Sequence, residues 1–124
     1  MSNKNFASAI VFKDWNLLVN IGTTSREKRK KQVIIVNLRV EVNFSKAMMT
    51  DNLEHTLDYS LLYNKIKRAL EGSNFNLLEA LANKIIKLCF AFKSVKAVYI
   101  SLEKPNVLGK DCRVMLEVFK KRRA

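Results

Sequence analysis

The chain has 124 residues, 48% of them hydrophobic and 27% charged, with three glycines and one proline. This composition predicts one folded domain over residues 1–124 and argues against disorder, linkers or low-complexity sequence. The formal net charge of +12 is concentrated in two short basic runs, residues 26–31 and the tail 120–124, and does not describe the whole surface. The cysteines Cys89 and Cys112 are far apart and the only histidine is His55, so no metal site is expected.

The N-terminal part of the chain predicts a first strand followed by a polar connection. Lys13 interrupts its short apolar run, which is typical of neither a signal peptide nor a membrane span, so we expect a cytoplasmic protein. Residues Ser8–Ile21 are rich in β-branched and aromatic side chains and predict a strand. The polar stretch Gly22–Gln32 follows, and it contains the basic run Arg26–Lys31 around Glu27. Such runs are usually solvated loops, although they can also bind nucleic acid.

The middle of the chain predicts a second strand and a first helix. Val33–Phe44 is the clearest strand, because apolar and polar residues alternate along it with a period of two. Together with the first strand and the polar loop, it predicts a hairpin. Ser45–Tyr59 reads as a mostly polar crossing. Ser60–Glu71 then predicts a helix with one apolar face, and Gly72 is expected to end it.

The last third of the chain predicts another helix and two more strands. Leu77–Phe92 has apolar residues at helical spacing, with Cys89 on the apolar side, where we expect a buried free thiol. Val95–Glu103 predicts a third strand, which Pro105 ends because proline lacks the N–H that a strand ladder needs. Arg113–Phe119 alternates again and predicts the fourth strand.

The predicted order of elements is β-β-α-α-β-β, which indicates the α+β class. We expect an antiparallel four-stranded sheet with both helices on one face. Such a sheet leaves long edge strands unpaired, which is a liability for a monomer. Pairing between subunits would cover these edges, so we expect a homo-oligomer.

A carboxylate in the first turn of an apolar helix needs an explanation, and Glu79 is such a residue. Asn76 is a good N-cap, and Glu79 follows three residues later, as in a capping box. An acidic residue in the first turn also suits the helix dipole. Taken by themselves, the residues therefore favour a structural role for Glu79.

Four short strings, in order along the chain, change that interpretation. They are "IGTTSRE" ending at Glu27, "TDNLEHTLDY" ending at Tyr59, "FNLLE" ending at Glu79, and "KPN" at Lys104–Asn106. With these strings, almost the whole chain resembles the dihydroneopterin aldolase family, folate-pathway enzymes of the tunnelling fold. The resemblance implies a fold like the one above, with subunits joined edge to edge into a tetrameric ring, two stacked rings in an octamer, and active sites between neighbouring subunits.

The resemblance also assigns roles to individual residues. Glu79 is expected to bind the N–H groups of a pterin ring, with a backbone amide near Leu78 serving the ring carbonyl, because a carboxylate meets a planar N–C–N donor pair with two hydrogen bonds. Lys104 is expected to be the general acid and base of a retro-aldol cleavage, which needs neither a cofactor nor a metal. A lysine side chain in that role must have its pKa lowered by burial or by nearby charge. Tyr59, from the adjacent subunit, would be its proton-transfer partner. Glu27 would contact the hydroxylated substrate tail.

Asp58 is a weaker candidate, expected to position Tyr59 or the loop before it. The sequence also departs from the family where the substrate tail should lie. It has "VNIG" where a Tyr-His pair usually precedes the glycine, Val107 and Leu108 after "KPN" where Ala-Pro is usual, and Arg26 and Lys28 around the loop glutamate. These departures put the identity of the substrate in doubt more than recognition of the ring.

Two alternatives to the aldolase therefore stay open. One is the sister enzyme dihydroneopterin triphosphate 2′-epimerase, whose substrate a basic loop could hold. The other is a non-catalytic oligomer that binds nucleic acid through Arg26–Lys31 and Lys120–Arg123.

Overall fold

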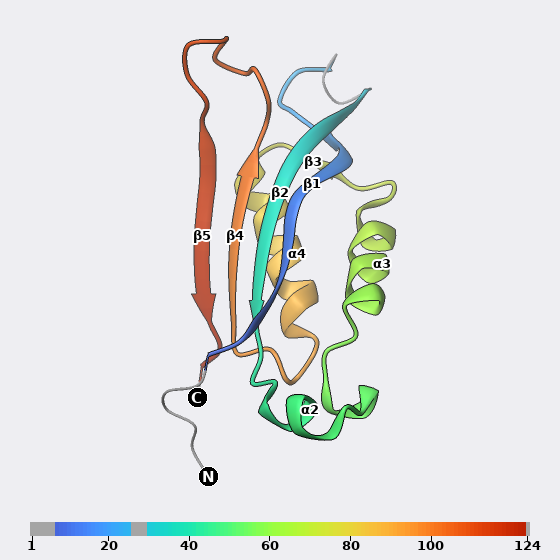
Figure 1. Cartoon of the computed structure of the whole chain (residues 1–124). Helices are drawn as coiled ribbons and strands as arrows, with labels where there is room; N and C mark the ends of the chain where they lie inside the picture. The colour runs from blue at the N-terminus through green and yellow to red at the C-terminus, as the bar shows by residue number, and fades with distance from the viewer. Residues whose placement is uncertain (1–6, 26–29, 124) are drawn as a thin grey trace.

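The computed structural model of the chain describes residues 7–25 and 30–123. Its elements are, in chain order, β1 (Ala9–Ile21), β2 (Lys31–Glu41), α2 (Ser45–Thr50), the short 3-10 helix η1 (Leu53–His55), α3 (Tyr59–Leu70), β3 (Asn74–Phe75), α4 (Leu78–Phe90), β4 (Ala97–Glu103) and β5 (Met115–Lys121). Figure 1 shows the strands side by side, with α3 and α4 packed along them.

The sheet has five strands in the order β3-β1-β2-β4-β5. The four predicted strands are present and pair antiparallel with their neighbours. The prediction of a purely antiparallel, four-stranded sheet is wrong, because β3 pairs parallel with the end of β1, Asn20 beside Asn74 and Ile21 beside Phe75. A two-residue strand is too short to show alternation. The crossing predicted over Ser45–Tyr59 is also more regular than expected, since it contains α2 and η1.

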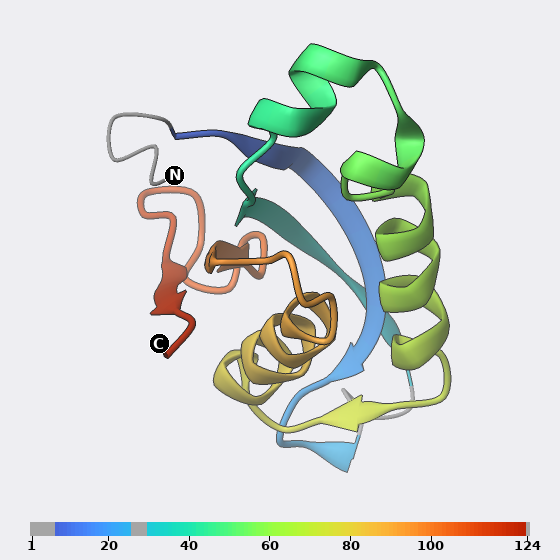
Figure 2. The same cartoon turned by 90° about the horizontal axis from the view of Figure 1, so that it is seen from below.

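One hydrophobic cluster fills the space between the sheet and the helices. The inward-facing residues of β2 and β4 are fully buried, and the apolar faces of α3 and α4 pack against them. Figure 2 shows β1 curving around α4, with α3 beside β1. The strand contributions to this cluster are Leu17, Val19, Ile21, Ile34, Val36, Leu38, Val40, Val98, Ile100 and Leu102.

Among the described residues, β5 and most of β1 have open edges. β5 is the last strand on one side, and β3 covers only the last two residues of β1 on the other. Large apolar side chains are exposed on both strands, among them Leu18 and Phe119, each 59% exposed. Open, partly apolar edges of this length invite pairing with another strand.

The predicted basic tail is largely part of the fold. β5 extends to Lys121, two residues beyond the predicted strand end. Arg122 then donates hydrogen bonds to the carbonyls of Val95 at 2.7 Å, Phe90 at 2.7 Å and Phe92 at 3.0 Å, and its guanidinium lies over the Phe90 ring. It therefore satisfies carbonyls at the end of α4 and in the turn that follows. Arg122 of the tail therefore has a structural role.

Three features of the structure relate to the membrane, metal and cysteine predictions. No helix in the described part of the chain is long and apolar enough to cross a membrane. Within residues 7–25 and 30–123, no three His, Cys, Asp or Glu side chains lie close enough to hold a metal ion. Both cysteines are free, and burial raises the pKa of Cys89 to about 12, as expected of an unreactive core thiol. The cytoplasmic location and the lack of a metal cofactor stay predictions.

Candidate active site

Glu79 does not form the predicted capping box. Helix α4 begins at Leu78, its N-cap is Leu77, and no side chain accepts a hydrogen bond from its first amides. The reason is the β3 pairing: the Phe75 carbonyl accepts a hydrogen bond from the Gly22 amide, and the chain then bends at residues 76 and 77, with Leu77 in extended backbone geometry, before the helix begins. The helix therefore starts one residue later than Asn76 would start it. Glu79 is exposed and has no hydrogen bond or ion pair with any described residue.

The start of α4 is also rich in unused hydrogen-bond donors. Its first main-chain bond runs from the Leu81 amide to the Leu77 carbonyl at 3.4 Å. The amides of Leu78, Glu79 and Ala80 come before that bond, so no carbonyl of the helix can accept from them. The carboxylate of Glu79 and the amide of Leu78 thus lie together at the positive end of a helix dipole. This pair matches a planar ligand that offers N–H donors next to a carbonyl.

Lys104 follows the last residue of β4 and is half-buried. Val98, Ile100 and Leu102 of β4 belong to the core on the helix side of the sheet. Because strand residues alternate between faces, continuing this pattern places Lys104 on the side of α4. β4 and the first turn of α4 also reach the same end of the molecule (Figure 1). Lys104 and Glu79 therefore lie toward the same end and on the same side of the sheet.

Asp58 and Tyr59 lie at the start of α3, and the other end of this helix is the one that leads toward α4. Asp58 is the N-cap of that helix, and its carboxylate accepts the amides of Ser60 at 3.0 Å and Leu61 at 3.1 Å. Tyr59 is the first helical residue and is 59% exposed. The 12 residues of α3 span about 18 Å, and only their far end leads into β3 and α4. Within one protomer, Tyr59 is therefore well away from Lys104 and Glu79.

The predicted site residue Glu27 lies outside the described residues, so its position is not part of the site's geometry. The loop that contains it leaves β1 at Gly22, whose amide is bonded to Phe75 of β3. It therefore starts at the same end of the molecule as the first turn of α4. Its role stays a prediction.

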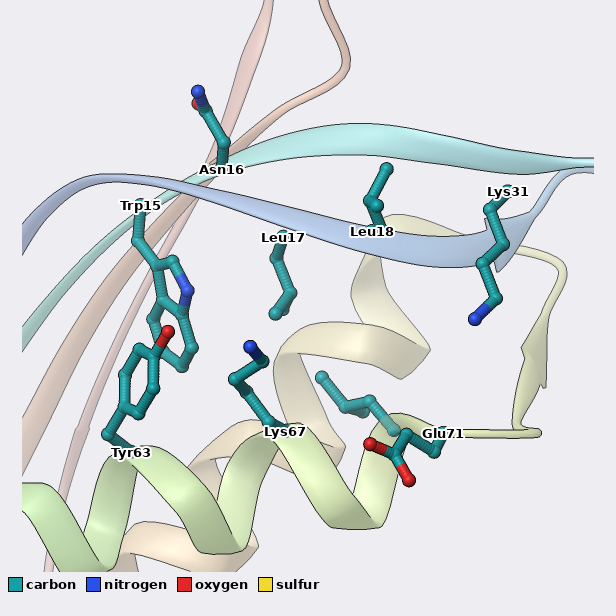
Figure 3. Close-up of a pocket in the computed structure, with 9 residues that line it drawn as sticks. Trp15, Asn16, Leu17, Leu18, Lys31, Tyr63, Lys67 and Glu71 are labelled. Carbon is teal, nitrogen blue, oxygen red and sulfur yellow. The ribbon is translucent and has the colours of Figure 1, made fainter.

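A separate cavity of about 280 Å³ lies between β1 and α3, and sequence reasoning did not single it out. Figure 3 shows Trp15 stacked on Tyr63, with Lys67 and Lys31 further along the cavity. The two ring centroids are 4.9 Å apart. No motif could reveal this contact, because it joins a strand and a helix far apart in the sequence. None of the predicted site residues lines it.

The chain is similar to known proteins over most of its length. The family model described as dihydroneopterin aldolase matches residues 10–118. Dihydroneopterin aldolase 1 of Arabidopsis thaliana is 33% identical over 104 residues, which are 83% of this chain and 71% of that protein. Dihydroneopterin triphosphate 2′-epimerase of Pseudomonas aeruginosa is 29% identical over 96 residues, which are 77% of this chain and 78% of that protein.

Solved structures show the same architecture. The structure of Escherichia coli dihydroneopterin aldolase in complex with neopterin superposes with a TM-score of 0.83, at 20% identity, over 91% of this chain and 98% of that one. At this level of identity, the likeness concerns the fold. The five-stranded sheet and its helices thus have a close structural counterpart among proteins of known structure.

Proposed function

The chain belongs to the dihydroneopterin aldolase family and is a carbon–carbon lyase of folate biosynthesis, and from this premise we propose how its residues carry out the reaction. The substrate is 7,8-dihydroneopterin, and the products are 6-hydroxymethyl-7,8-dihydropterin and glycolaldehyde. The observation that carries the residue assignment is Glu79. It is an exposed carboxylate that caps nothing, lies at a helix N-terminus, and shares one end of the molecule with Lys104.

Ring recognition falls to the first turn of α4. The Glu79 carboxylate accepts two hydrogen bonds from the ring amide and the exocyclic amino group, and the Leu78 amide donates to the ring carbonyl. The unused donors at the helix start support this role. A site that pairs both donors and an acceptor rejects rings with a different pattern, because these would leave polar groups unpaired.

Lys104 is the proposed general base and acid. It removes the proton of the 2′-hydroxyl, directly or through a water molecule. The C1′–C2′ bond then breaks, C2′ becomes the aldehyde carbon of glycolaldehyde, and the electron pair moves into the C6=N5 imine of the ring. Protonation at C1′ completes the hydroxymethyl product. Because the substrate carries its own electron sink, no covalent amine intermediate is needed. Glu27 is proposed to place the 2′-hydroxyl.

Two subunits make each site in this proposal. Tyr59 comes from the neighbour and transfers protons with Lys104, while Asp58 holds the helix start that presents Tyr59. The whole length of α3 lies between Tyr59 and the part of the chain that leads to Glu79, and this separation supports a site shared between subunits. The open edges of β1 and β5 support assembly by strand pairing. We propose a tetrameric ring, with an octamer of two stacked rings as the larger form.

A product assay tests the proposed function. Purified protein is incubated with 7,8-dihydroneopterin, and 6-hydroxymethyl-7,8-dihydropterin is quantified by chromatography. We expect product from the wild type and a loss of at least about a hundredfold in Lys104→Ala, because a positioned acid or base contributes roughly that much or more. Equal rates in the two proteins would contradict the role of Lys104. An inactive wild type would contradict the aldolase.

The similarity to the Pseudomonas enzyme supports a second candidate function, that of a dihydroneopterin triphosphate 2′-epimerase. Supplying dihydroneopterin triphosphate in the same assay distinguishes the two enzymes. Formation of the 2′-epimer without cleavage would assign the chain to the epimerase branch. For the nucleic-acid alternative, the contact of Arg122 with the end of α4 assigns one residue of the basic tail a structural role, whereas Lys120 and Lys121 are exposed on β5.

A further inference from the structure

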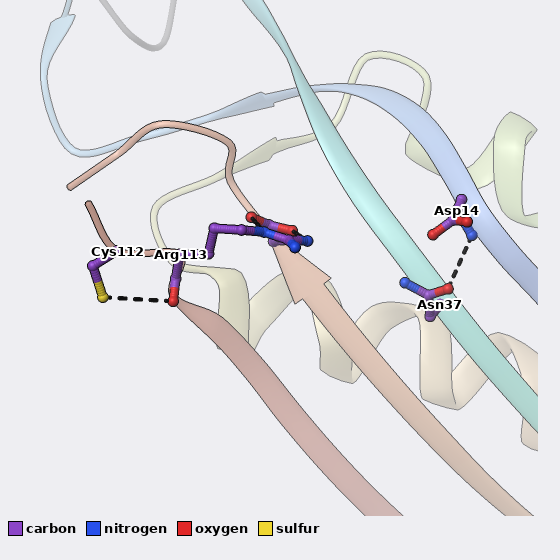
Figure 4. Close-up of polar contacts among 5 residues, drawn as sticks. Asp14, Asn37, Cys112 and Arg113 are labelled. Atoms are coloured by element: carbon purple, nitrogen blue, oxygen red, sulfur yellow. Dashed lines mark hydrogen bonds and ion pairs between the residues drawn. The ribbon is translucent and has the colours of Figure 1, made fainter. Parts of the chain in front are cut away.

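An ion pair with a buried carboxylate and an exposed arginine lies next to the proposed catalytic lysine in the chain. Glu103 is the last residue of β4 and immediately precedes Lys104, and its side chain is only 7% exposed. Arg113 donates to it with two nitrogens, Nε to Oε2 at 2.9 Å and the guanidinium Nη2 to Oε1 at 2.7 Å. Figure 4 shows Arg113 reaching across from the start of β5 to the end of β4. Neither residue has a role in the proposed reaction.

The pair joins the two ends of the loop that begins with Lys104. Glu103 is the cross-strand partner of Met115, so Arg113, two residues earlier, is its diagonal neighbour on the same face of the sheet. The loop residues 106–114 are all exposed, so packing does little to hold them. A guanidinium and a carboxylate that meet through two parallel hydrogen bonds restrict orientation as well as distance. The geometry therefore fixes both stems of the loop.

Nearby charges indicate that the pair stays ionised. The hydrogen bonds from Arg113 hold the pKa of Glu103 below its ordinary value of 4.5. The hydrogen bonds to Glu103, and to a smaller degree the charge of Asp14, raise the pKa of Arg113. Asp14 lies at the irregular point of β1, where its amide donates to Asn37 of β2 at 2.9 Å (Figure 4). Arg113 is thus hydrogen-bonded to one carboxylate, Glu103, on the helix-free face of the sheet, and the charge of Asp14 acts on it from β1.

We propose that Glu103 and Arg113 are positioning residues for Lys104, which fix the backbone at the base of its loop so that its amine meets the substrate hydroxyl. Glu103 and Lys104 are consecutive and point to opposite faces, so anchoring one sets the direction of the other. This inference rests on the proposed function. It assigns no contact with substrate to either residue.

Kinetics and binding of four single variants and one double variant test the proposal. The variants are Arg113→Ala, Arg113→Lys, Glu103→Gln, the double variant of Glu103→Gln with Arg113→Ala, and the matched control Arg39→Ala. The control removes another arginine–glutamate pair on the same face, Arg39 with Glu41 at 3.5 Å, on the part of β2 distant from Lys104. The readouts are kcat and KM with 7,8-dihydroneopterin and the Kd of neopterin measured by fluorescence.

We expect Arg113→Ala to lower kcat by about tenfold to a hundredfold, since small misplacements of a catalytic group cost that much. KM and the neopterin Kd should stay within about twofold, because ring binding belongs to α4. Arg113→Lys should recover part of kcat, because it keeps the charge but loses the fork geometry. Glu103→Gln should also lower kcat. The double variant should be no worse than the poorer single variant, since both remove one interaction.

The results separate this inference from the proposed function. If the wild type is active and both Arg113→Ala and Glu103→Gln keep its kcat, the positioning role is wrong. A loss of kcat as large in Arg39→Ala, or a fall in neopterin affinity that accounts for the whole effect, would also overturn it. An inactive wild type would instead contradict the aldolase itself. Glu103→Gln keeps the size of the side chain, so the test does not depend on the folding of Arg113→Ala alone.

Discussion

Mixing two inactive variants should restore activity if each active site is shared between subunits. The variants are Lys104→Ala, which lacks the proposed base, and Tyr59→Phe, which lacks the proposed proton-transfer hydroxyl. Tyr59 starts α3, whose 12 residues span about 18 Å before the chain reaches β3 and α4. Because Lys104 lies at that far end, one protomer cannot supply both groups to one substrate.

The size of the recovery follows from the arrangement. Equal amounts of the two variants are assumed to enter a closed ring at random. The subunit that supplies position 104 to an interface then has an intact Lys104 in half of the interfaces. Its neighbour supplies an intact Tyr59 in half of those, so about a quarter of the sites are complete. We expect the mixed oligomer to reach about 25% of the wild-type rate per subunit, far above either parent.

Co-expression of the two variants with different affinity tags, followed by tandem purification, gives the mixed oligomer for the product assay. Each variant purified alone serves as the control, together with a simple mixture of the two purified parents. Activity no greater than the mean of the parents would refute the shared site, provided that both tags are present in one particle. A monomer in sedimentation analysis would refute it more directly.

Three further measurements follow from the structure. Glu79→Gln should weaken neopterin binding by about tenfold to a hundredfold, which is the value of a charged hydrogen bond. It should change the free energy of unfolding by less than about 0.5 kcal/mol, because Glu79 caps nothing. A loss of stability near 1 kcal/mol in urea unfolding would instead support the capping role. Arg122→Ala should lower the free energy of unfolding by roughly 1–3 kcal/mol through its lost carbonyl contacts, whereas Arg123→Ala should change it by less than about 0.5 kcal/mol; equal urea midpoints would contradict this. Because Arg113 lowers the pKa of Glu103, the pair stabilises the fold fully above pH 4.5, the ordinary pKa, and loses this effect as the pH falls through the lowered pKa. Melting curves should therefore show the wild type losing its stability advantage over Glu103→Gln below about pH 4.5. A stability difference independent of pH would argue against an ionised pair.

Local pattern was sufficient for the longer elements. The alternation over Val33–Phe44 predicted β2, and the apolar spacing before Gly72 predicted α3, because a core on one side imposes a period of two on strands and of 3.6 on helices. Cys89 was placed in the core by the same spacing. Each of these features depends only on neighbours in the sequence.

Contacts between distant segments were not predictable in this way. β3 exists because Asn74 and Phe75 meet the end of β1, and this pairing delays the start of α4 and removes the expected capping box at Glu79. Arg122 reads as part of a solvated tail in the sequence, but it binds carbonyls about thirty residues earlier in the chain. The cavity beside Trp15 and Tyr63 also has no local signature.

The sequence by itself determined the α+β class, the order of the long elements and, through four short strings, the family and its candidate residues. The tertiary structure decided how those residues are distributed. Glu79 and Lys104 share one end of the sheet, Tyr59 lies a helix length away, and Glu103 and Arg113 join the stems of the Lys104 loop. The reason is that side-chain periodicity reports which face a residue occupies, whereas its distance from another residue depends on strand register and helix packing, which no local pattern encodes.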